Sequence, residues 1–443
     1  MTPAEMKSHV RQTIDAHASE LEALARQIFA QPELGFKEHR TASLVHDWFE
    51  RLGLQHTDGI AVTGTRANIA GGSPGPTVAI LGELDSLLCW EHPERDPRTG
   101  AVHACGHNAQ VATMLGAGLA LREVAGELAG RIALMAVPAE EYVELEERQK
   151  FREQGQLEFL GGKAEMVRLG AFDDVDIAMM VHATSRPEDG DIAVGGTNNG
   201  MVAKFVRFLG RTSHAGGAPY QGINALSAAR VALAGIDAIR ETFKDEDHVR
   251  VHPIITRGGD VVNAIPADVR LELFCRGASV EAMELAHRKV DRALKAGALA
   301  LGGAVEITTL PGYLPLFHDP NLVAMFRGNA VSIVGADNVH EKGHGGGSTD
   351  MGDISHLLPT VHPYAGGASG AGHGADYHLD DYTKAVLNPA KAIAMTVIDL
   401  LSDSASAARR IQAEFTPRMT RPDYLAYLRR LTTRTLYRAE ELE

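Results

Sequence analysis

The sequence predicts an α/β protein with a central, mostly parallel sheet and a smaller inserted domain of βαββαβ order. Three observations support this prediction. Short apolar runs of strand length, at residues 77–82, 131–137 and 176–181, alternate with helical patterns. From about residue 200 the order becomes strand, helix, strand, strand, helix, strand, as in a ferredoxin-like unit. The chain has 443 residues, too many for one ordinary core.

The predicted elements of the inserted domain follow one another closely. Strand-like runs are "MVAKFVRFLG", "VRVHPIITRG", "DVRLELFCRG" and "AVEITTL", and the two helix-like runs begin at Gly222 and Val280. We therefore expect residues 197–313 to form the inserted domain, and residues 1–196 and 314–443 to form the main domain. The tail after Asn388 is predicted to be helical.

Composition and charge exclude several classes of function. The 43 Lys and Arg against 57 Asp and Glu give a net charge of −14, which argues against a nucleic-acid partner. The N-terminal segment is polar, and no segment has the apolar length of a membrane span. The three cysteines, widely spaced, form neither a disulfide framework nor a four-cysteine zinc module. These features predict a cytoplasmic protein, without a membrane partner, that acts on a small-molecule substrate.

Acidic and histidine side chains follow the predicted strands of the main domain. Glu83 and Asp85 come after the first strand, Glu140 and Glu141 after the second, and His182 after the third. Because parallel strands end at one edge of a sheet, where ligands bind in open α/β folds, we expect these side chains to form one site.

The motif "HACGH" adds Cys105 and His107 to this set. Alone it is weak, because a cysteine is often a small apolar filler of a core. Together with Glu141, His182 and the late His373, however, it supplies thiolate, imidazole and carboxylate groups, the ligand types of zinc, manganese and related ions. The sequence predicts a divalent metal, Mn or Zn, bound as one or two ions, with His103 left as a loop residue or a neighbour of a ligand.

The adjacent glutamates suggest a division of labour. If Glu141 binds metal, Glu140 can act as general base on water whose pKa the ion lowers from about 15.7 towards about 7. The alternative is a solvated helix N-terminus, where glutamate is common. Asp85 would hold a ligand histidine in the correct tautomer, or would simply cap the strand end.

Motifs throughout the chain resemble the M20 metallopeptidase family, within it the amidohydrolase branch of aminoacylases, auxin-conjugate hydrolases and aminobenzoyl-glutamate hydrolases. These motifs are "QPELGFKEHRTASLV", "GELDSL", "HACGH", "VPAEE", "SHAGGAPYQGINAL", "VVNAIPADVRLELFCRG", "GGGSTDMGD" and "GHGADYHLDD". The resemblance implies that Glu140 is the general base and that the metal ligands are Cys105, His107, Glu141, His182 and His373.

The resemblance also implies that the inserted domain is a lid and dimerisation module. A homodimer or higher homo-oligomer would form through it. His214 in "SHAGG" and Asn263 in "VVNAIP" would then reach the active site and stabilise an oxyanion. The alternatives are a histidine at a helix start and an asparagine in a turn.

Three departures from the family pattern bear on specificity. Asn108 stands where many members of the branch have Asp, although the aminobenzoyl-glutamate-like and dipeptidase-like members resemble this chain in having Asn. Residues 142–163 form a charged insertion after Glu141, interpreted either as a solvated surface helix or as a segment that shapes the pocket mouth. His182 is followed by "ATSRPEDGD" rather than a proline-patterned continuation.

Three functions are consistent with these features. The first is hydrolysis of the amide of an N-acyl or N-aroyl amino acid, or of a dipeptide-like substrate. The second is hydrolytic deamination of an amino-aromatic compound with release of ammonia. The third is non-catalytic metal or ligand binding, which the intact Glu140–Glu141 pair disfavours.

Overall fold

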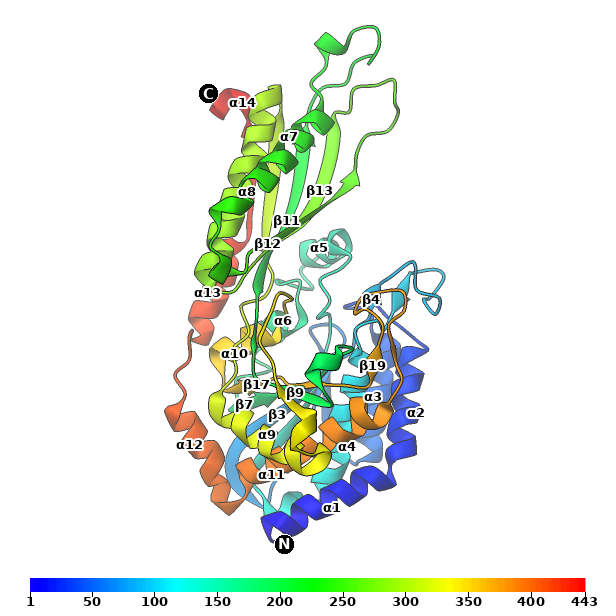
Figure 1. The fold of residues 1–443 in the computed structure, drawn as a ribbon, viewed down its shortest axis with the longest axis vertical. Helices are drawn as coiled ribbons and strands as arrows, with labels where there is room; N and C mark the ends of the chain where they lie inside the picture. The colour runs from blue at the N-terminus through cyan, green and yellow to red at the C-terminus, as the bar shows by residue number, and fades with distance from the viewer. Residues whose placement is uncertain (443) are drawn as a thin grey trace. The chain divides into compact units, whose positions relative to one another are not determined.

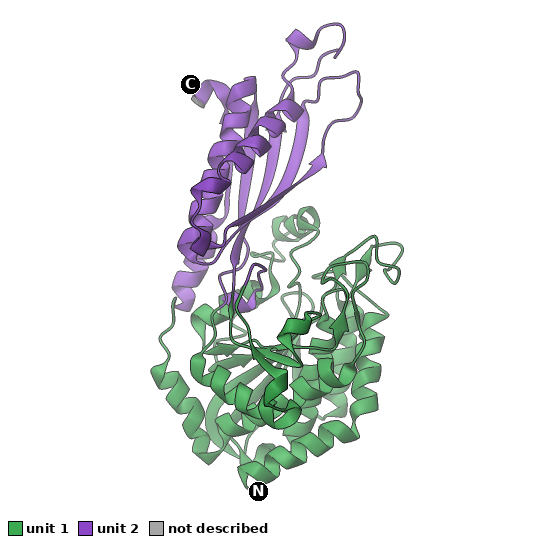
Figure 2. Ribbon diagram, in the orientation of Figure 1, with its two compact units in different colours: residues 1–197, 317–344, 353–418 green, residues 198–316, 345–352, 419–443 purple. Residues whose placement is uncertain are grey.

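The computed structural model describes residues 1–442, which divide into two compact units (Figure 2). Unit 1 comprises residues 1–197, 317–344 and 353–418, and unit 2 comprises residues 198–316, 345–352 and those from 419 onward. The sequence prediction placed the last two of these segments in the main domain, whereas their contacts in the structure are with unit 2.

A six-stranded sheet forms the centre of unit 1, in the order β1-β2-β6-β3-β7-β17. Strands β3, β6, β7 and β17 run parallel to one another, and β1 and β2 add an antiparallel edge. The strands are β1 His56–Ile60, β2 Gly64–Ala70, β3 Ser73–Glu83, β6 Ala129–Val137, β7 Ile177–Met179 and β17 Thr360–Val361. The central, mostly parallel sheet predicted from the sequence is confirmed, since the three predicted strands are the neighbours β6, β3 and β7.

Helix α4, His107–Val124, lies against β3 and is buried along nearly its whole length. Its sequence is apolar on all sides, as expected for a helix enclosed by other elements. Around it pack α1 Pro3–Ala16, α2 Ala18–Phe29 and α11 Asn388–Leu401, and α9 Pro320–Val334 packs against α11 (Figure 1). This arrangement fixes the N-terminus of α4 at the edge where the parallel strands end.

Shorter elements of unit 1 surround this edge. A small sheet has the order β15-β9-β18-β8. Its strands are β8 His182–Ala183, β9 Ile192–Val194, β15 Val339–Glu341 and β18 Tyr364–Ala365. The remaining helices of this region are α3 His39–Arg51, α5 Leu145–Glu153 and α6 Gly162–Arg168.

Unit 2 has the predicted βαββαβ order, followed by one more strand. Its sheet has the order β12-β13-β11-β14-β21, and the described pairings within it are antiparallel. The elements are β11 Gly200–Leu209, α7 Ala225–Ala238, β12 Arg250–Arg257, β13 Asp268–Gly277, α8 Val280–Leu301 and β14 Ala304–Pro311. Alternate residues of β13 are buried, as expected for a sheet whose one face is covered by helices, and α7 and α8 pack against each other.

The prediction of a helical tail is wrong at one place. Residues Thr433–Arg438 form β21, which pairs with β14 over its whole length. The sequence "TRTLYR" alternates β-formers with arginines, but only the open edge of β14 supplies the hydrogen-bond partners that make it a strand.

Among the described residues, no single helix is long and apolar enough to span a membrane. One bent pair, Thr383–Leu401 with Asp403–Glu414, meets the length and composition criteria when the two are taken together.

Candidate metal centre

The predicted ligands stand at the carboxyl ends of the parallel strands. Glu83 is the last residue of β3 and lies opposite Val137, the last residue of β6, so the segments that follow both strands leave the sheet at the same edge. Glu140 and Glu141 follow β6 directly, and His182 begins β8. The local geometry therefore brings together residues that are far apart in the sequence.

The glycine between Cys105 and His107 allows both side chains to point towards the same position. Gly106, between them, has a φ of 87°, and a Cβ there would lie 2.7 Å from both the Ala183 Cβ and the Tyr377 hydroxyl. Both the left-handed backbone and the lack of space require glycine. The turn aims the thiol and the imidazole inwards at the start of α4.

The five predicted ligands fall into two groups that share a thiol. The donor atoms of Cys105, His107 and His182 lie within 4.8 Å of one another, and so do those of Cys105, Glu141 and His373. Cys105 Sγ is 3.3 Å from His182 Nε2, and His373 Nε2 is 3.1 Å from Glu141 Oε1. The backbone N–H of His373 donates to Ala104, which ties its loop to the "HACGH" motif. This arrangement provides two adjacent positions for an ion.

Buried polar atoms mark the same place. His107 Nε2 lies 3.1 Å from Glu83 Oε2 and Glu141 Oε1 lies 3.1 Å from His373 Nε2, and beyond these ion-pair contacts neither buried atom has a hydrogen-bond partner. Such atoms are costly in a protein interior unless something else binds them. The thiol, imidazole and carboxylate donors fit a divalent transition metal, so the residues present suit the predicted ion.

Burial and neighbouring charges shift the pKa values of these groups. Burial acts to raise the pKa of Cys105, but His182 and His107 outweigh it and lower that pKa to about 6. The Glu141 carboxylate raises the pKa of His373 well above its ordinary value. Burial opposes the charge of His107, yet Glu83 and Cys105 raise its pKa. The centre therefore favours a thiolate, which is the form that binds metal.

Asp85 contacts both predicted ligands next to it. His107 Nδ1 lies 2.9 Å from the Asp85 backbone oxygen and 3.3 Å from its Oδ1. The backbone N–H of Glu141 donates to Asp85 Oδ2 at 2.7 Å. The carbonyl contact needs a proton on His107 Nδ1, which leaves the lone pair of Nε2 able to bind a metal.

Glu140 lies beside the centre rather than within either group of ligands. Its Oε2 is 3.8 Å from His107 Nε2, and its side chain is buried. With Glu83 and His107 it forms a third set of mutually close donor atoms. The preceding residue, Ala139, has a φ of 52°, so the chain turns sharply just before the two glutamates.

A buried ion pair behind His107 was not identified from the sequence as part of the site. Glu83 is fully buried, and its carboxylate accepts from Lys163 Nζ at 2.5 Å and from Gln110 Nε2 at 2.9 Å. Glu83 Oε2 is also 3.1 Å from His107 Nε2. Burial acts to raise the pKa of Glu83, but Lys163 and His107 lower it to about 2. Glu83 was visible as a residue at a strand end, but nothing local pointed to Lys163, 80 positions away.

Glu38 supports the turn before the glutamates. It is fully buried, and its carboxylate accepts from the backbone N–H of Ala139 at 2.7 Å and from the Thr63 hydroxyl at 2.6 Å. Burial and the charge of Asp85 raise the pKa of Glu38 to about 7. The only sequence signal for this role is its position in the motif "QPELGFKEHR".

Besides Lys163, a buried arginine anchors the insertion to the centre. Arg148, in α5, is only 1% exposed and donates to the backbone oxygens of Glu141 and Leu160. Its guanidinium lies over the rings of Phe36 and Tyr142. The insertion also carries solvated pairs such as Lys150–Glu147, so it combines an exposed surface with an attachment to a predicted ligand.

Asn108 and His103, in the "HACGHN" segment, belong to neither ligand group. Asn108 is fully buried and donates from Nδ2 to the Ala25 oxygen of α2, so it serves helix packing. His103 is buried with neither ring nitrogen hydrogen-bonded, and burial lowers its pKa to about 3.

The two predicted residues of the inserted domain lie together in unit 2. The backbone oxygen of Asn263 accepts from Ala215, and His214 forms an isolated β-bridge with Ala264. Neither residue is buried. His214 Nδ1 accepts from the backbone N–H groups of Gly216 and Gly217, which assigns the proton of the neutral ring to Nε2.

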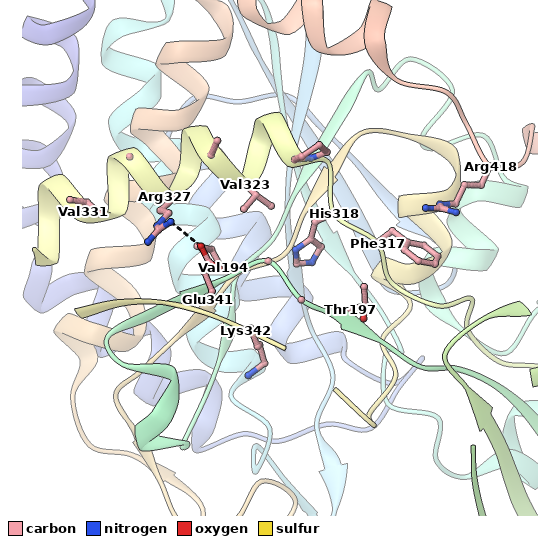
Figure 3. Close-up of a pocket in the computed structure, with 15 residues that line it drawn as sticks. Val194, Thr197, Phe317, His318, Val323, Arg327, Val331, Glu341, Lys342 and Arg418 are labelled. Carbon is pink, nitrogen blue, oxygen red and sulfur yellow. Dashed lines mark hydrogen bonds and ion pairs between the residues drawn. The ribbon is translucent and has the colours of Figure 1, made fainter. Parts of the chain in front are cut away.

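A cavity of about 830 Å³ in unit 1 is lined by none of the five predicted ligands (Figure 3). It is bounded by α9, β9 and β15. Arg327 and Glu341 form an ion pair there at 3.0 Å, and Arg418 stacks on Phe317. His318 lines it with two buried ring nitrogens that form no hydrogen bond, and burial lowers the pKa of His318 to about 4. This cavity holds none of the predicted catalytic groups.

Comparison with known proteins identifies the family. Residues 79–399 match the profile of Peptidase family M20/M25/M40. The chain is 30% identical to the Xaa-Arg dipeptidase of Mus musculus over 424 residues, covering 89% of each chain. It is 28% identical to one component of the p-aminobenzoyl-glutamate hydrolase of Escherichia coli, over 69% of this chain and 68% of that protein.

A solved structure shares the fold. It is a dinuclear metal-binding peptidase of the M20 family from Bacillus subtilis, with a TM-score of 0.65, 21% identity, and coverage of 87% of this chain and 99% of that one. The family resemblance found in the sequence motifs is confirmed. The chain belongs to Peptidase family M20/M25/M40 and is a hydrolytic enzyme that acts on amide C–N bonds.

Proposed function

We propose that this enzyme hydrolyses the amide bond of N-acyl or N-aroyl amino acids or of dipeptides, with Glu140 as general base. One observation carries the proposal. Two groups of metal-ligand side chains share Cys105, and Glu140 lies beside them without belonging to either. The relatives named for Xaa-Arg dipeptides and for aminobenzoyl-glutamate support the substrate class.

In this proposal Cys105, His107 and His182 would hold one divalent ion, and Cys105, Glu141 and His373 would hold a second. The mixed thiolate, imidazole and carboxylate set suits Zn or Mn. When bound, such an ion supplies Lewis acidity, which lowers the pKa of water and polarises the substrate carbonyl. The two buried atoms that form no hydrogen bond, on His107 and Glu141, would become ligands.

The protein's own residues then handle the proton. Glu140 accepts a proton from the attacking water at its carboxylate and returns it to the leaving nitrogen, so that the amide yields a carboxylic acid and an amine. The side chain of Glu140 is buried, which limits exchange of that proton with solvent. Asp85 keeps His107 in the tautomer that leaves Nε2 available.

We propose that residues 197–313 act as a lid and dimerisation module, with His214 and Asn263 as donors to the oxyanion of the tetrahedral intermediate. The tautomer of His214 supports a donor role, because Nδ1 already accepts two backbone N–H groups. Donors of this kind contribute on the order of 3 kcal/mol each.

The edge of the unit 2 sheet supports a homodimer. Strand β12 pairs only with β13 among the described strands, and Ile254 on it is 61% exposed. An unpaired edge with exposed apolar side chains favours association with another copy. Sedimentation analysis of the wild type and of Ile254→Lys tests this, with a dimer expected for the first and a shift towards monomer for the second.

The substrate assay is designed to separate the proposed amide hydrolysis from deamination. Enzyme loaded with Mn or Zn is incubated with N-acyl amino acids, dipeptides with C-terminal Arg, aminobenzoyl-glutamate and amino-aromatic compounds, and release of amino acid and of ammonia is measured separately. Release of an amino acid without ammonia is expected. Ammonia alone would indicate a deaminase, and no turnover of any compound would contradict the proposed substrate class.

A further inference from the structure

Two histidines and an aspartate form a cluster outside the hydrolytic centre. His46 lies on α3, and His56 and Asp58 lie two residues apart on β1. Side chains at positions i and i+2 of a strand point to the same face, so both β1 residues face the helix side chain. None of the three belongs to the ligand groups around Cys105.

Two distances within this cluster are close to those between ligands of a bound ion. His46 Nε2 is 3.1 Å and His56 Nε2 is 3.4 Å from the same oxygen, Asp58 Oδ1. Ligands placed about 2.0–2.1 Å from a tetrahedral ion are separated from one another by about 3.3–3.4 Å. The two imidazole rings are stacked, with centroids 5.1 Å apart and an interplanar angle of 22°. All three donor atoms lie within 4.8 Å of one another, so they are placed to share one ion.

The hydrogen bonds around the cluster leave Nε2 of His46 and Nε2 of His56 able to bind a metal ion. His46 Nε2 is buried and has no hydrogen-bond partner, although it lies close to Asp58. His56 Nδ1 contacts the Leu54 backbone oxygen at 3.4 Å, which places the proton there and leaves Nε2 as a lone-pair donor. The Thr65 hydroxyl donates to Asp58 Oδ1 at 3.0 Å and orients that carboxylate.

The surroundings allow an ion to enter and to complete its coordination. The side chain of Asp58 is 51% exposed, so solvent can reach the site and supply the remaining ligand. Two neutral imidazoles and one carboxylate are ligand types that zinc takes, whereas Mg²⁺ and Ca²⁺ prefer oxygen alone. A surface ion pair would use the same residues, but it would not require two imidazole nitrogens at one carboxylate oxygen.

We propose that His46, His56 and Asp58 bind a divalent transition metal of the zinc type, separate from the hydrolytic centre. This ion links the C-terminal half of α3 to β1. Helix α3 follows directly on Glu38, which holds the turn before Glu140, so the ion stabilises an element that carries part of the active-site scaffold. The role is structural, and it does not depend on which amide the enzyme hydrolyses.

Zinc binding to the full-length protein tests the proposal. Chelator-treated wild type, His46→Gln and His56→Gln are dialysed against Zn²⁺, and bound metal is counted by elemental analysis. The matched control is His9→Gln, which removes another surface histidine that is ion-paired with a single carboxylate, Glu123. We expect both cluster variants to bind one ion fewer per chain than wild type and the control to bind the same number.

A thermal melt gives a second readout. Zn²⁺ should raise the Tm of wild type and His9→Gln more than that of His56→Gln, while hydrolytic activity is equal in the metal-loaded enzymes. If either His variant fails to fold by circular dichroism, Asp58→Asn, which keeps the side-chain shape, replaces it. Equal metal content and equal Tm response in wild type and the cluster variants would overturn the proposal, as would loss of the ion in the His9 control.

Discussion

At the scale of single residues, the adjacent glutamates have different surroundings. The backbone of Glu141 is held by Asp85 and its carboxylate faces His373, whereas the Glu140 carboxylate lies 3.8 Å from His107 Nε2. The turn at Ala139 leads directly into the pair. A pair of identical side chains can therefore carry two roles.

Glu140→Gln should retain metal and lose turnover. We expect kcat to fall by roughly 10²–10⁴, the usual contribution of a general base, because an amide cannot accept the proton. Elemental analysis and steady-state kinetics measure the two properties. Glu141→Gln is the matched control and should lose metal. Full turnover by Glu140→Gln would show that another group is the base.

Lys163→Met should destabilise unit 1. Removing one partner of a buried ion pair leaves the Glu83 charge uncompensated and costs about 3–5 kcal/mol. Chemical denaturation measures the free energy of unfolding, and the double variant Lys163→Met with Glu83→Gln should recover part of the loss. Lys244→Met, at an exposed pair with Glu246, is the control and should change stability by less than about 1 kcal/mol. A loss at Lys163 no larger than the control's would contradict this account of the ion pair.

At the scale of elements, the insertion is more than a solvated helix. Its exposed side carries the charged pairs expected from the sequence, but Arg148 fixes α5 to the backbone of Glu141. The surface interpretation of this segment was therefore incomplete, because a single buried cation cannot be recognised among many charged residues of one helix.

Arg148→Met should loosen α5 and reduce catalysis. The substitution removes the guanidinium donor from the Leu160 and Glu141 carbonyl oxygens, of which the second keeps the Val143 N–H, at a cost of about 1–3 kcal/mol. We expect a lower Tm and a lower kcat/KM, since the Glu141 segment loses its support. Lys150→Met, on the exposed side of the same helix, should leave both unchanged.

Deletion of residues 145–158 tests whether the segment also selects substrates. A change in the ratio of kcat/KM between N-acyl amino acids and dipeptides is expected if α5 shapes the pocket mouth. A uniform loss for all substrates, with a lower Tm, would assign it a structural role alone.

At the scale of the whole molecule, buried neutral histidines make stability depend on pH. In unit 2, burial, with Lys204 and Arg288, lowers the pKa of His287 to about 3. A base whose pKa is lower in the folded state binds fewer protons there than in the unfolded chain. Its contribution is therefore complete above about pH 6.5 and is lost as the pH falls towards 3.

His287→Gln should remove this part of the pH dependence. Below about pH 6.5, the free energy of unfolding of wild type should fall more steeply than that of the variant, by up to about 1.4 kcal/mol per pH unit. Denaturation at about pH 7, 6 and 5 measures the difference. Parallel curves would mean that His287 is protonated equally in both states.

The sequence by itself determined the features that depend on local pattern. Apolar runs located β3, β6 and β7, and the residues after them indicated a shared edge, because parallel strands end together. The order of strands and helices in unit 2 was likewise a property of local periodicity. The five candidate ligands could be named because they follow strands or lie in compact motifs.

Only the tertiary structure decided the contacts between distant segments. Glu83 meets Lys163 across 80 positions, and Glu38 meets Ala139 across 101. Residues 433–438 become a strand because the edge of β14 is open to them. His46 and Asp58 meet because α3 packs beside β1. Such pairings leave no periodic trace in the sequence, since each depends on how separate elements pack in three dimensions.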